Sequence, residues 1–148
     1  MNRTVRDLIS SGRVSQFGFV KPDASVLWAL QVLKATDTGA VLVVDGTDLR
    51  GIFSERDLAR AATRAGPLNL DLAVDRLMTK DLVTVDPGQT LEQCMLLMSK
   101  YHVRHLPVVE NGAPVGLLSM RHIMEALVED KQFMIEEMTK YLMGSNYA

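Results

Sequence analysis

The hydrophobic positions of the chain predict one order of elements twice: strand, helix, strand, strand, helix. The first set lies at 19–21, 26–33, 40–44 and 51–54. Within it, Val26, Leu30 and Leu33 recur at spacings of three and four, as on one face of a helix. The apolar run that follows predicts a buried strand, and a polar turn containing Gly46 predicts a hairpin with the next strand. A second helix is expected directly after Ser54.

The second set repeats this order at 82–86, 91–98, 106–109 and 115–119. The offset is 65 residues, from Gly51 to Gly116 and from Ser54 to Ser119, and no gap is needed. One unit alone is too small to bury both faces of its sheet. We therefore predict an α/β (α+β) fold in which two pseudo-twofold-related β-α-β-β-α repeats pack sheet to sheet, followed by a C-terminal helical extension.

Breaks in this pattern predict the domain boundaries. The expected parts are a first repeat with an N-terminal helix at 1–65, a linker at 66–73, a second repeat at 74–129 and a helical extension at 130–148. Apolar residues continue at near-helical spacing through the extension, at Ile123, Leu127, Met134, Met138 and Leu142. One two-repeat module cannot bury so long an apolar face. We therefore expect it to pack against a second chain in a homodimer, the commonest oligomer.

Composition narrows the class of protein. Lys and Arg are scattered and the net charge is −2, which does not suggest a nucleic-acid partner. No apolar run approaches the length of a membrane span, and the first residues lack a signal-peptide core. The single cysteine, Cys94, rules out a disulfide within the chain. These features favour a cytoplasmic protein, with Cys94 as a core thiol and Trp28 as a packing residue.

Short motifs in a fixed order make the chain resemble the cystathionine β-synthase (CBS) domain family, and its two repeats resemble a Bateman module. They are Leu77-Met78-Thr79, Arg104-His105-Leu106-Pro107-Val108-Val109 and the two Gly-x-x-Ser elements, and the resemblance covers about residues 5–127. It implies a regulatory domain that binds AMP, ADP, ATP, NAD or S-adenosylmethionine between the repeats. Arg104 and His105 favour a phosphate over a sulfonium, so AMP or NAD is preferred.

Ser54 and Asp57 open the second helix of the first repeat and allow two interpretations. One is a capping box, in which Ser54 and Asp57 satisfy free backbone groups. The other is a nucleotide site, because a helix N-terminus can bind a phosphate and a carboxylate can accept ribose hydroxyls. The resemblance implies a ribose-binding role for Asp57. His122 replaces this acid in the second repeat, so we expect one competent site, with the other empty, weakened or altered.

The basic cluster at 101–105 lies in the turn between the helix and the strand of the second repeat, whereas the first repeat has Gly39 and Ala40 there. The Arg104 guanidinium offers a fork of donors for a phosphate. The predicted nucleotide-binding residues are Phe19, Gly39, Ala40, Val41, Ser54, Arg56, Asp57, Thr84, Arg104, His105, Leu106, Pro107, Ser119, Arg121 and His122. His102 and His105 lack further ligands at metal-site spacing, so we expect no metal.

No motif of an enzyme is present in the sequence. It has neither a Walker-type phosphate loop nor a nucleophile elbow. We therefore expect a regulatory sensor of AMP or NAD, with ATP and ADP as further candidate ligands and an unidentified protein as its target. The alternatives are a sensor of S-adenosylmethionine or ATP and a structural module for dimerisation or partner binding with a vestigial ligand site.

Overall fold

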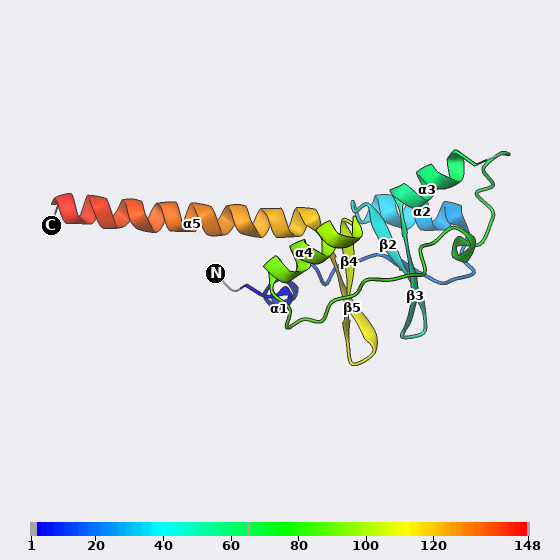
Figure 1. Cartoon of the computed structure of the whole chain (residues 1–148), viewed down its shortest axis with the longest axis horizontal. Helices are drawn as coiled ribbons and strands as arrows, with labels where there is room; N and C mark the ends of the chain where they lie inside the picture. Colours follow the sequence, from blue (N-terminus) through cyan, green and yellow to red (C-terminus); the bar gives the residue numbers. More distant parts are fainter. Residues whose placement is uncertain (1–2, 65, 148) are drawn as a thin grey trace.

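The computed structural model describes residues 3–64 and 66–147. Its elements are α1 (Val5–Ser10), β1 (Phe19–Val20), α2 (Val26–Ala35), β2 (Ala40–Asp45), β3 (Asp48–Ser54), α3 (Glu55–Ala62), the 3₁₀ turn η1 (Val74–Arg76), α4 (Leu91–Tyr101), β4 (His105–Glu110), β5 (Ala113–Ser119) and α5 (Met120–Tyr147). Figure 1 shows two small sheets side by side, with α2 and α3 beside one and α4 beside the other. The predicted fold class is confirmed, and so is the predicted order of elements except at the first strand of the second repeat.

Each half is built around one antiparallel hairpin. β2 pairs with β3, and β1 adds to β2 in parallel, whereas β4 pairs with β5 in a sheet of two strands. The first extended run of the second repeat is not a strand, because only Val85 forms a bridge, to Val108. The register shifts at Val43/Val44 in one hairpin and at the equivalent Val108/Val109 in the other. Even this local irregularity follows the offset of 65 residues.

The chain that precedes each repeat crosses to the other half. The N–H of Ile52 in β3 donates to Thr79 O at 3.0 Å, and the N–H of Leu117 in β5 donates to Val14 O at 3.1 Å. These four residues form two pairs related by the same offset. Each hairpin is therefore tied to the segment that leads into the other repeat, which holds the halves in a pseudo-twofold arrangement.

This crossing decides which core each leading segment joins. Val5 and Leu8 of α1 are fully buried in the core of the second half, so the N-terminal helix does not pack with the repeat that it precedes. The segment 66–73, the predicted linker, is hydrogen-bonded to the first half. Within it, Leu72 O accepts from the Val26 N–H at 2.8 Å. A third cluster, which includes Leu42 and Leu117, joins the two sheets.

Two side chains show how far the core extends. Cys94 is fully buried in the second core, as predicted, and burial followed by the charge of Asp86 raises the pKa of its thiol to about 11. Trp28 was predicted to pack, but it is 54% exposed on α2. The buried face of α2 is formed by Val26, Ala29 and Leu33, and Trp28 lies outside this face.

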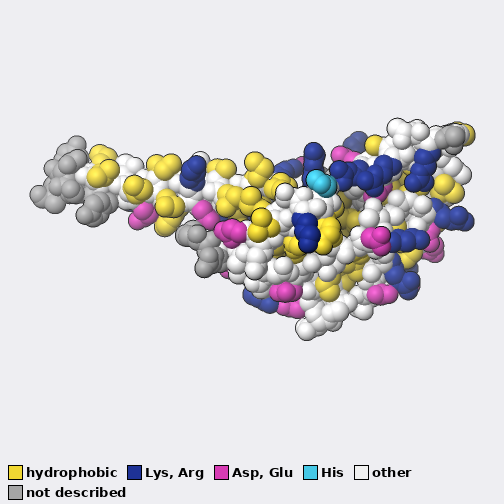
Figure 2. All heavy atoms as spheres, in the orientation of Figure 1, with side chains coloured by type: hydrophobic (Ala, Val, Ile, Leu, Met, Phe, Trp, Pro, Cys, Tyr) yellow, Lys and Arg dark blue, Asp and Glu magenta, His cyan; other side chains and the backbone are white. Residues whose placement is uncertain are grey.

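The last helix, α5, begins against the second half and then leaves it. Arg3 Nη1 contacts Asp130 Oδ1 at 3.1 Å, and Arg13 forms an ion pair with Glu129. Every side chain described beyond Asp130 is exposed. Figures 1 and 2 show this part projecting from the body with hydrophobic side chains along it. No helix in the described ranges is long and apolar enough to cross a membrane.

Candidate functional site

Two cavities lie where the repeats meet, and the offset of 65 residues relates their walls. We name them the Asp57 cavity, of about 620 Å³, and the His122 cavity, of about 1060 Å³. Ser54, Arg56 and Asp57 line the first at positions equivalent to those of Ser119, Arg121 and His122 in the second. Four residues line both cavities, namely Gly39, Glu55, Arg104 and His105.

Asp57 lies at the N-terminus of α3 and is held on both carboxylate oxygens. Its Oδ2 accepts from the Ser54 N–H at 2.9 Å and from the Ser54 hydroxyl at 3.2 Å, in the capping box that the sequence predicts. Its Oδ1 accepts from the Thr79 hydroxyl at 2.8 Å. Of the residues described, Asp57 is the one buried charged side chain, with 6% exposed. These three hydrogen bonds fix its orientation toward the cavity wall.

A carboxylate offers about four lone-pair positions. Three hydrogen bonds to Asp57 leave about one acceptor position, on Oδ1. One hydroxyl of a ligand can therefore bind Asp57 directly without rearrangement, and a second needs the Ser54 hydroxyl to turn away. The N-terminus of α3 adds a positive end of a helix dipole at the same place.

The opposite wall carries the basic cluster in the turn from α4 to β4. His102 caps α4 in the left-handed conformation, with φ of 54°, and its carbonyl accepts from Arg56 Nη1 at 2.7 Å. This bond joins α3 of one repeat to the turn of the other. Arg104, two residues further along this turn, is exposed and lines the same cavity as Asp57.

His105 forms part of the wall between the two cavities. A Cβ placed on Gly39 would lie 3.3 Å from His105 Cε1, so the absence of a side chain there leaves room for the ring. Burial, followed by the charges of His122 and Arg104, lowers the pKa of His105 to about 4. The imidazole is consequently neutral at pH 7. Of the two residues predicted to contact a phosphate, Arg104 can contribute a positive charge, whereas the neutral His105 can contribute only a hydrogen bond.

His122 replaces the acid of the capping box and keeps its role, which sequence reasoning missed. Its Nδ1 accepts from the Ser119 N–H at 2.9 Å, and its own N–H donates to Ser119 Oγ at 3.2 Å. Because Nδ1 is an acceptor, its lone pair must stay free of a proton. Burial is the main cause that lowers the pKa of His122, in agreement with a neutral ring. The half-buried His122 therefore caps the start of α5 as Asp57 caps the start of α3.

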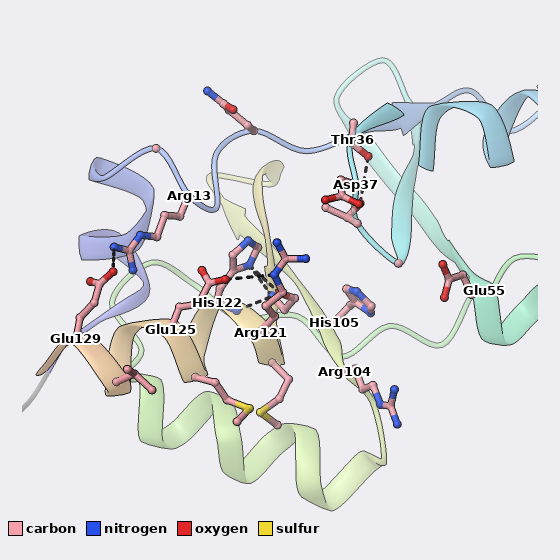
Figure 3. A pocket seen from close by; sticks show the side chains of 18 residues that line it. Arg13, Thr36, Asp37, Glu55, Arg104, His105, Arg121, His122, Glu125 and Glu129 are labelled. Atoms are coloured by element: carbon pink, nitrogen blue, oxygen red, sulfur yellow. Dashed lines mark hydrogen bonds and ion pairs between the residues drawn. The ribbon is translucent and has the colours of Figure 1, made fainter. Parts of the chain in front are cut away.

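The arginine of the His122 cavity is engaged differently from the arginine of the Asp57 cavity. Arg121 Nε binds Glu125 at 3.2 Å along α5, whereas its equivalent Arg56 bridges the repeats. Figure 3 shows this pair near His122, with Arg13 and Glu129 at the other end of the cavity. The hydrogen bond from Arg13 lowers the pKa of Glu129. Acids and bases alternate in this cavity, so it presents no single charge to a ligand.

Nine of the fifteen predicted residues line one of the two cavities. They are Gly39, Ser54, Arg56, Asp57, Arg104, His105, Ser119, Arg121 and His122. Six do not line either cavity. Ala40, Val41, Leu106 and Pro107 are buried backbone neighbours of the site, Thr84 is exposed beside Val83, and Phe19 is 63% exposed against Phe17.

Thr79 is the functional neighbour that sequence reasoning missed. It was noted only as part of the Leu77-Met78-Thr79 motif, yet its hydroxyl holds the carboxylate of Asp57. The repeat offset contained a signal, because the equivalent residue is Val14, which has no hydroxyl. The two repeats therefore differ at two equivalent positions: the first site has Thr79 beside Asp57, and the second has Val14 and His122 at the equivalent positions.

Comparisons with known proteins agree with this architecture. The family model of the CBS domain matches residues 4–64 and 74–129. The CBS domain-containing protein YhcV of Bacillus subtilis is 29% identical over 106 residues, 72% of this chain and 75% of that protein.

Two solved structures extend the likeness to three dimensions. The CBS-domain containing protein ATU1752 from Agrobacterium tumefaciens is 35% identical, with a TM-score of 0.77 over 83% of this chain and 98% of its own. CBSX2, solved in complex with AMP, is 26% identical, with a TM-score of 0.72 over 87% and 98%. The chain therefore belongs to the CBS domain family and carries two copies of the domain in tandem.

Proposed function

We propose that the chain is a regulatory module, not an enzyme, that binds AMP or a related adenine nucleotide in the Asp57 cavity and acts as a homodimer in signal transduction. One observation carries the proposal: a buried, oriented carboxylate at a helix N-terminus faces a basic residue across a cavity. Asp57 supplies the carboxylate and Arg104 the base. The relative CBSX2, which has been solved with AMP, supports the choice of ligand class.

The wall of the Asp57 cavity offers a partner for each part of a nucleotide. Asp57 Oδ1 can accept a ribose hydroxyl, and Arg104 can donate two hydrogen bonds to a phosphate. Ile52, Val83 and Val103 give an apolar surface for a base. The volume of about 620 Å³ is typical of small-molecule sites.

The charges of this cavity favour a ligand with few phosphates. Three arginines, Arg56, Arg60 and Arg104, line this cavity together with the acids Glu55, Asp57 and Asp81, and Arg56 is already bound to a carbonyl. Because His105 is neutral at pH 7, it cannot help to balance a triphosphate. We therefore rank AMP and NAD above ATP, ADP and S-adenosylmethionine as the ligand.

Calorimetric titration of the protein with AMP, NAD, ATP and S-adenosylmethionine tests this function. We expect AMP or NAD to bind below millimolar concentration. Replacing Asp57 with alanine should weaken binding by about 1–3 kcal/mol, because a hydrogen bond to a charged group is lost. Thermal unfolding of each variant separates lost binding from lost folding.

His122→Ala is the matched control, since it removes the equivalent capping side chain from the other repeat. It should destabilise its helix as Asp57→Ala does and leave the affinity for AMP unchanged. Loss of affinity in His122→Ala alone would place the ligand in the other cavity. If none of the four ligands binds below millimolar concentration, the sensor is refuted and a structural module with a vestigial site remains.

A further inference from the structure

An apolar stripe, interrupted by Lys131, runs along α5 from the body of the protein to the far part of the helix. It consists of Met124, Leu127, Val128, Met134, Ile135, Met138 and Leu142. At 3.6 residues per turn, these positions fall within about 120° of the helix circumference. Their exposed fractions lie between 36% and 62%. A stripe of this width is typical of a helix that packs on another element, and among the described residues nothing covers it.

In the projecting part of α5, the side chains described, at 131–140 and 142–143, have no packing against the body to stabilise the helix. Every side chain described there is exposed, and a helix of this length is only marginally stable alone in water. Its ion pair, between Lys140 and Glu137 at 3.5 Å, is on the surface and adds little. Burial of the stripe against a partner would supply the missing stability.

Lys131 indicates which partner fits. It lies in the middle of the stripe, and no ion pair is recorded for it among the described residues. A second copy packed in parallel would set Lys131 against itself across the twofold axis, which is unfavourable. A second copy packed antiparallel about Met134 brings Lys131 of each chain to the level of Glu137 of the other. A polar residue in an otherwise apolar seam often selects one such alignment.

We propose that α5 of a second copy packs antiparallel along this stripe and closes the open side of the His122 cavity. Met124 and Val128 carry the second part of the proposal, because they belong both to the stripe and to the wall of that cavity. In the antiparallel pair, Leu142 of the second copy lies at the level of Ala126, between these two residues. This geometry deepens the proposed homodimer and does not depend on which nucleotide binds.

Two substitutions within one turn test the face of the helix. Ile135 is on the stripe and Phe133 is on the opposite side, and their exposed fractions are 58% and 59%. Ile135→Asp should weaken the dimer at least about tenfold in light scattering, since a charge is placed in the seam. Phe133→Asp, the matched control, should leave it unchanged. A wild-type monomer at tens of micromolar refutes the homodimer, whereas a dimer that tolerates Ile135→Asp refutes only the stripe.

Charge reversal tests the antiparallel direction. Lys131→Glu should weaken the dimer, and adding Glu137→Lys should restore it. If the two helices are parallel, residue 131 still faces residue 131 of the second copy, and Glu137→Lys does not restore the dimer. That result would contradict the antiparallel direction.

A thiol placed at the cavity wall tests its closure. Met124→Cys should react with a thiol reagent at least about tenfold faster when Ile135→Asp is added, because the monomer leaves the cavity open. The buried Cys94, whose thiol pKa is about 11, contributes little to this signal. Equal rates would show that the second copy does not cover the cavity.

Discussion

Gly116→Ala is expected to lower the free energy of unfolding by up to about 3 kcal/mol, because the crossing backbone leaves no room for a methyl group. An added Cβ would lie 2.8 Å from Val14 Cγ1 and 3.0 Å from Val14 O. The carbonyl cannot retreat without losing its hydrogen bond from the Leu117 N–H. Urea unfolding monitored by circular dichroism measures the change.

Gly88→Ala is the matched control for this substitution. There the added Cβ would meet only Asp86 Oδ1, at 3.0 Å, which can turn away at the loss of one exposed hydrogen bond from the Gly88 N–H. Its free energy of unfolding should change by less than about 1 kcal/mol. Equal losses for the two variants would show that the close approach of the crossing segment is not what requires Gly116. The same reasoning applies to Gly51, whose Cβ would lie 2.9 Å from Thr79 O.

The second large effect is a loss of stability in mild acid. His105 has a pKa of about 4 in the folded protein, against a usual value of 6.5. Below pH 6.5 the imidazole binds a proton in the unfolded chain but stays neutral in the folded protein. The free energy of unfolding is therefore highest above pH 6.5 and decreases as the pH falls to about 4. The shift corresponds to about 3 kcal/mol. His122, whose pKa is also lowered by burial, acts in the same direction.

Urea unfolding at several pH values between 7.5 and 4 measures this loss. His105→Gln keeps a polar side chain of similar size but cannot titrate, so its stability should depend less on pH over this range. A variant with the pH dependence of the wild type would show that His105 is not the group responsible. His102, which is exposed on the same turn, provides the control substitution His102→Gln, with little expected effect.

The repeat made most of the fold predictable. An offset of 65 residues without gaps requires both copies to share their elements, and the structure preserves it down to the bulge in each hairpin. Local chemistry also explains the starts of α2 and α4, where the Ser25 and Thr90 side chains accept from the backbone N–H three residues later. The capping box of Ser54 and Asp57 follows from the same rule.

What could not be predicted depends on contacts between the halves. The crossing of α1 to the second core is decided by tertiary packing, and the periodicity of a short helix does not specify its partner. The same is true of Thr79, whose hydroxyl reaches Asp57 across 22 positions of sequence. Sequence rules for caps list acids and amides, so they do not anticipate an imidazole such as that of His122 as the acceptor.

The asymmetry between the repeats has a physical basis in three pairs of positions. Asp57 and Thr79 face one cavity, whereas His122 and Val14 occupy the equivalent places beside the other. Arg56 bridges the repeats at the first cavity, and its counterpart pairs along α5 instead. A ligand that binds one cavity more tightly than the other can therefore shift the relative packing of the halves.

A crystal structure of the protein grown with AMP tests the central claim most directly. We expect the nucleotide in the Asp57 cavity, with a ribose hydroxyl within hydrogen-bond distance of Asp57 Oδ1 and the phosphate beside Arg104. A nucleotide bound only in the His122 cavity, or one whose ribose does not contact Asp57, would contradict the account.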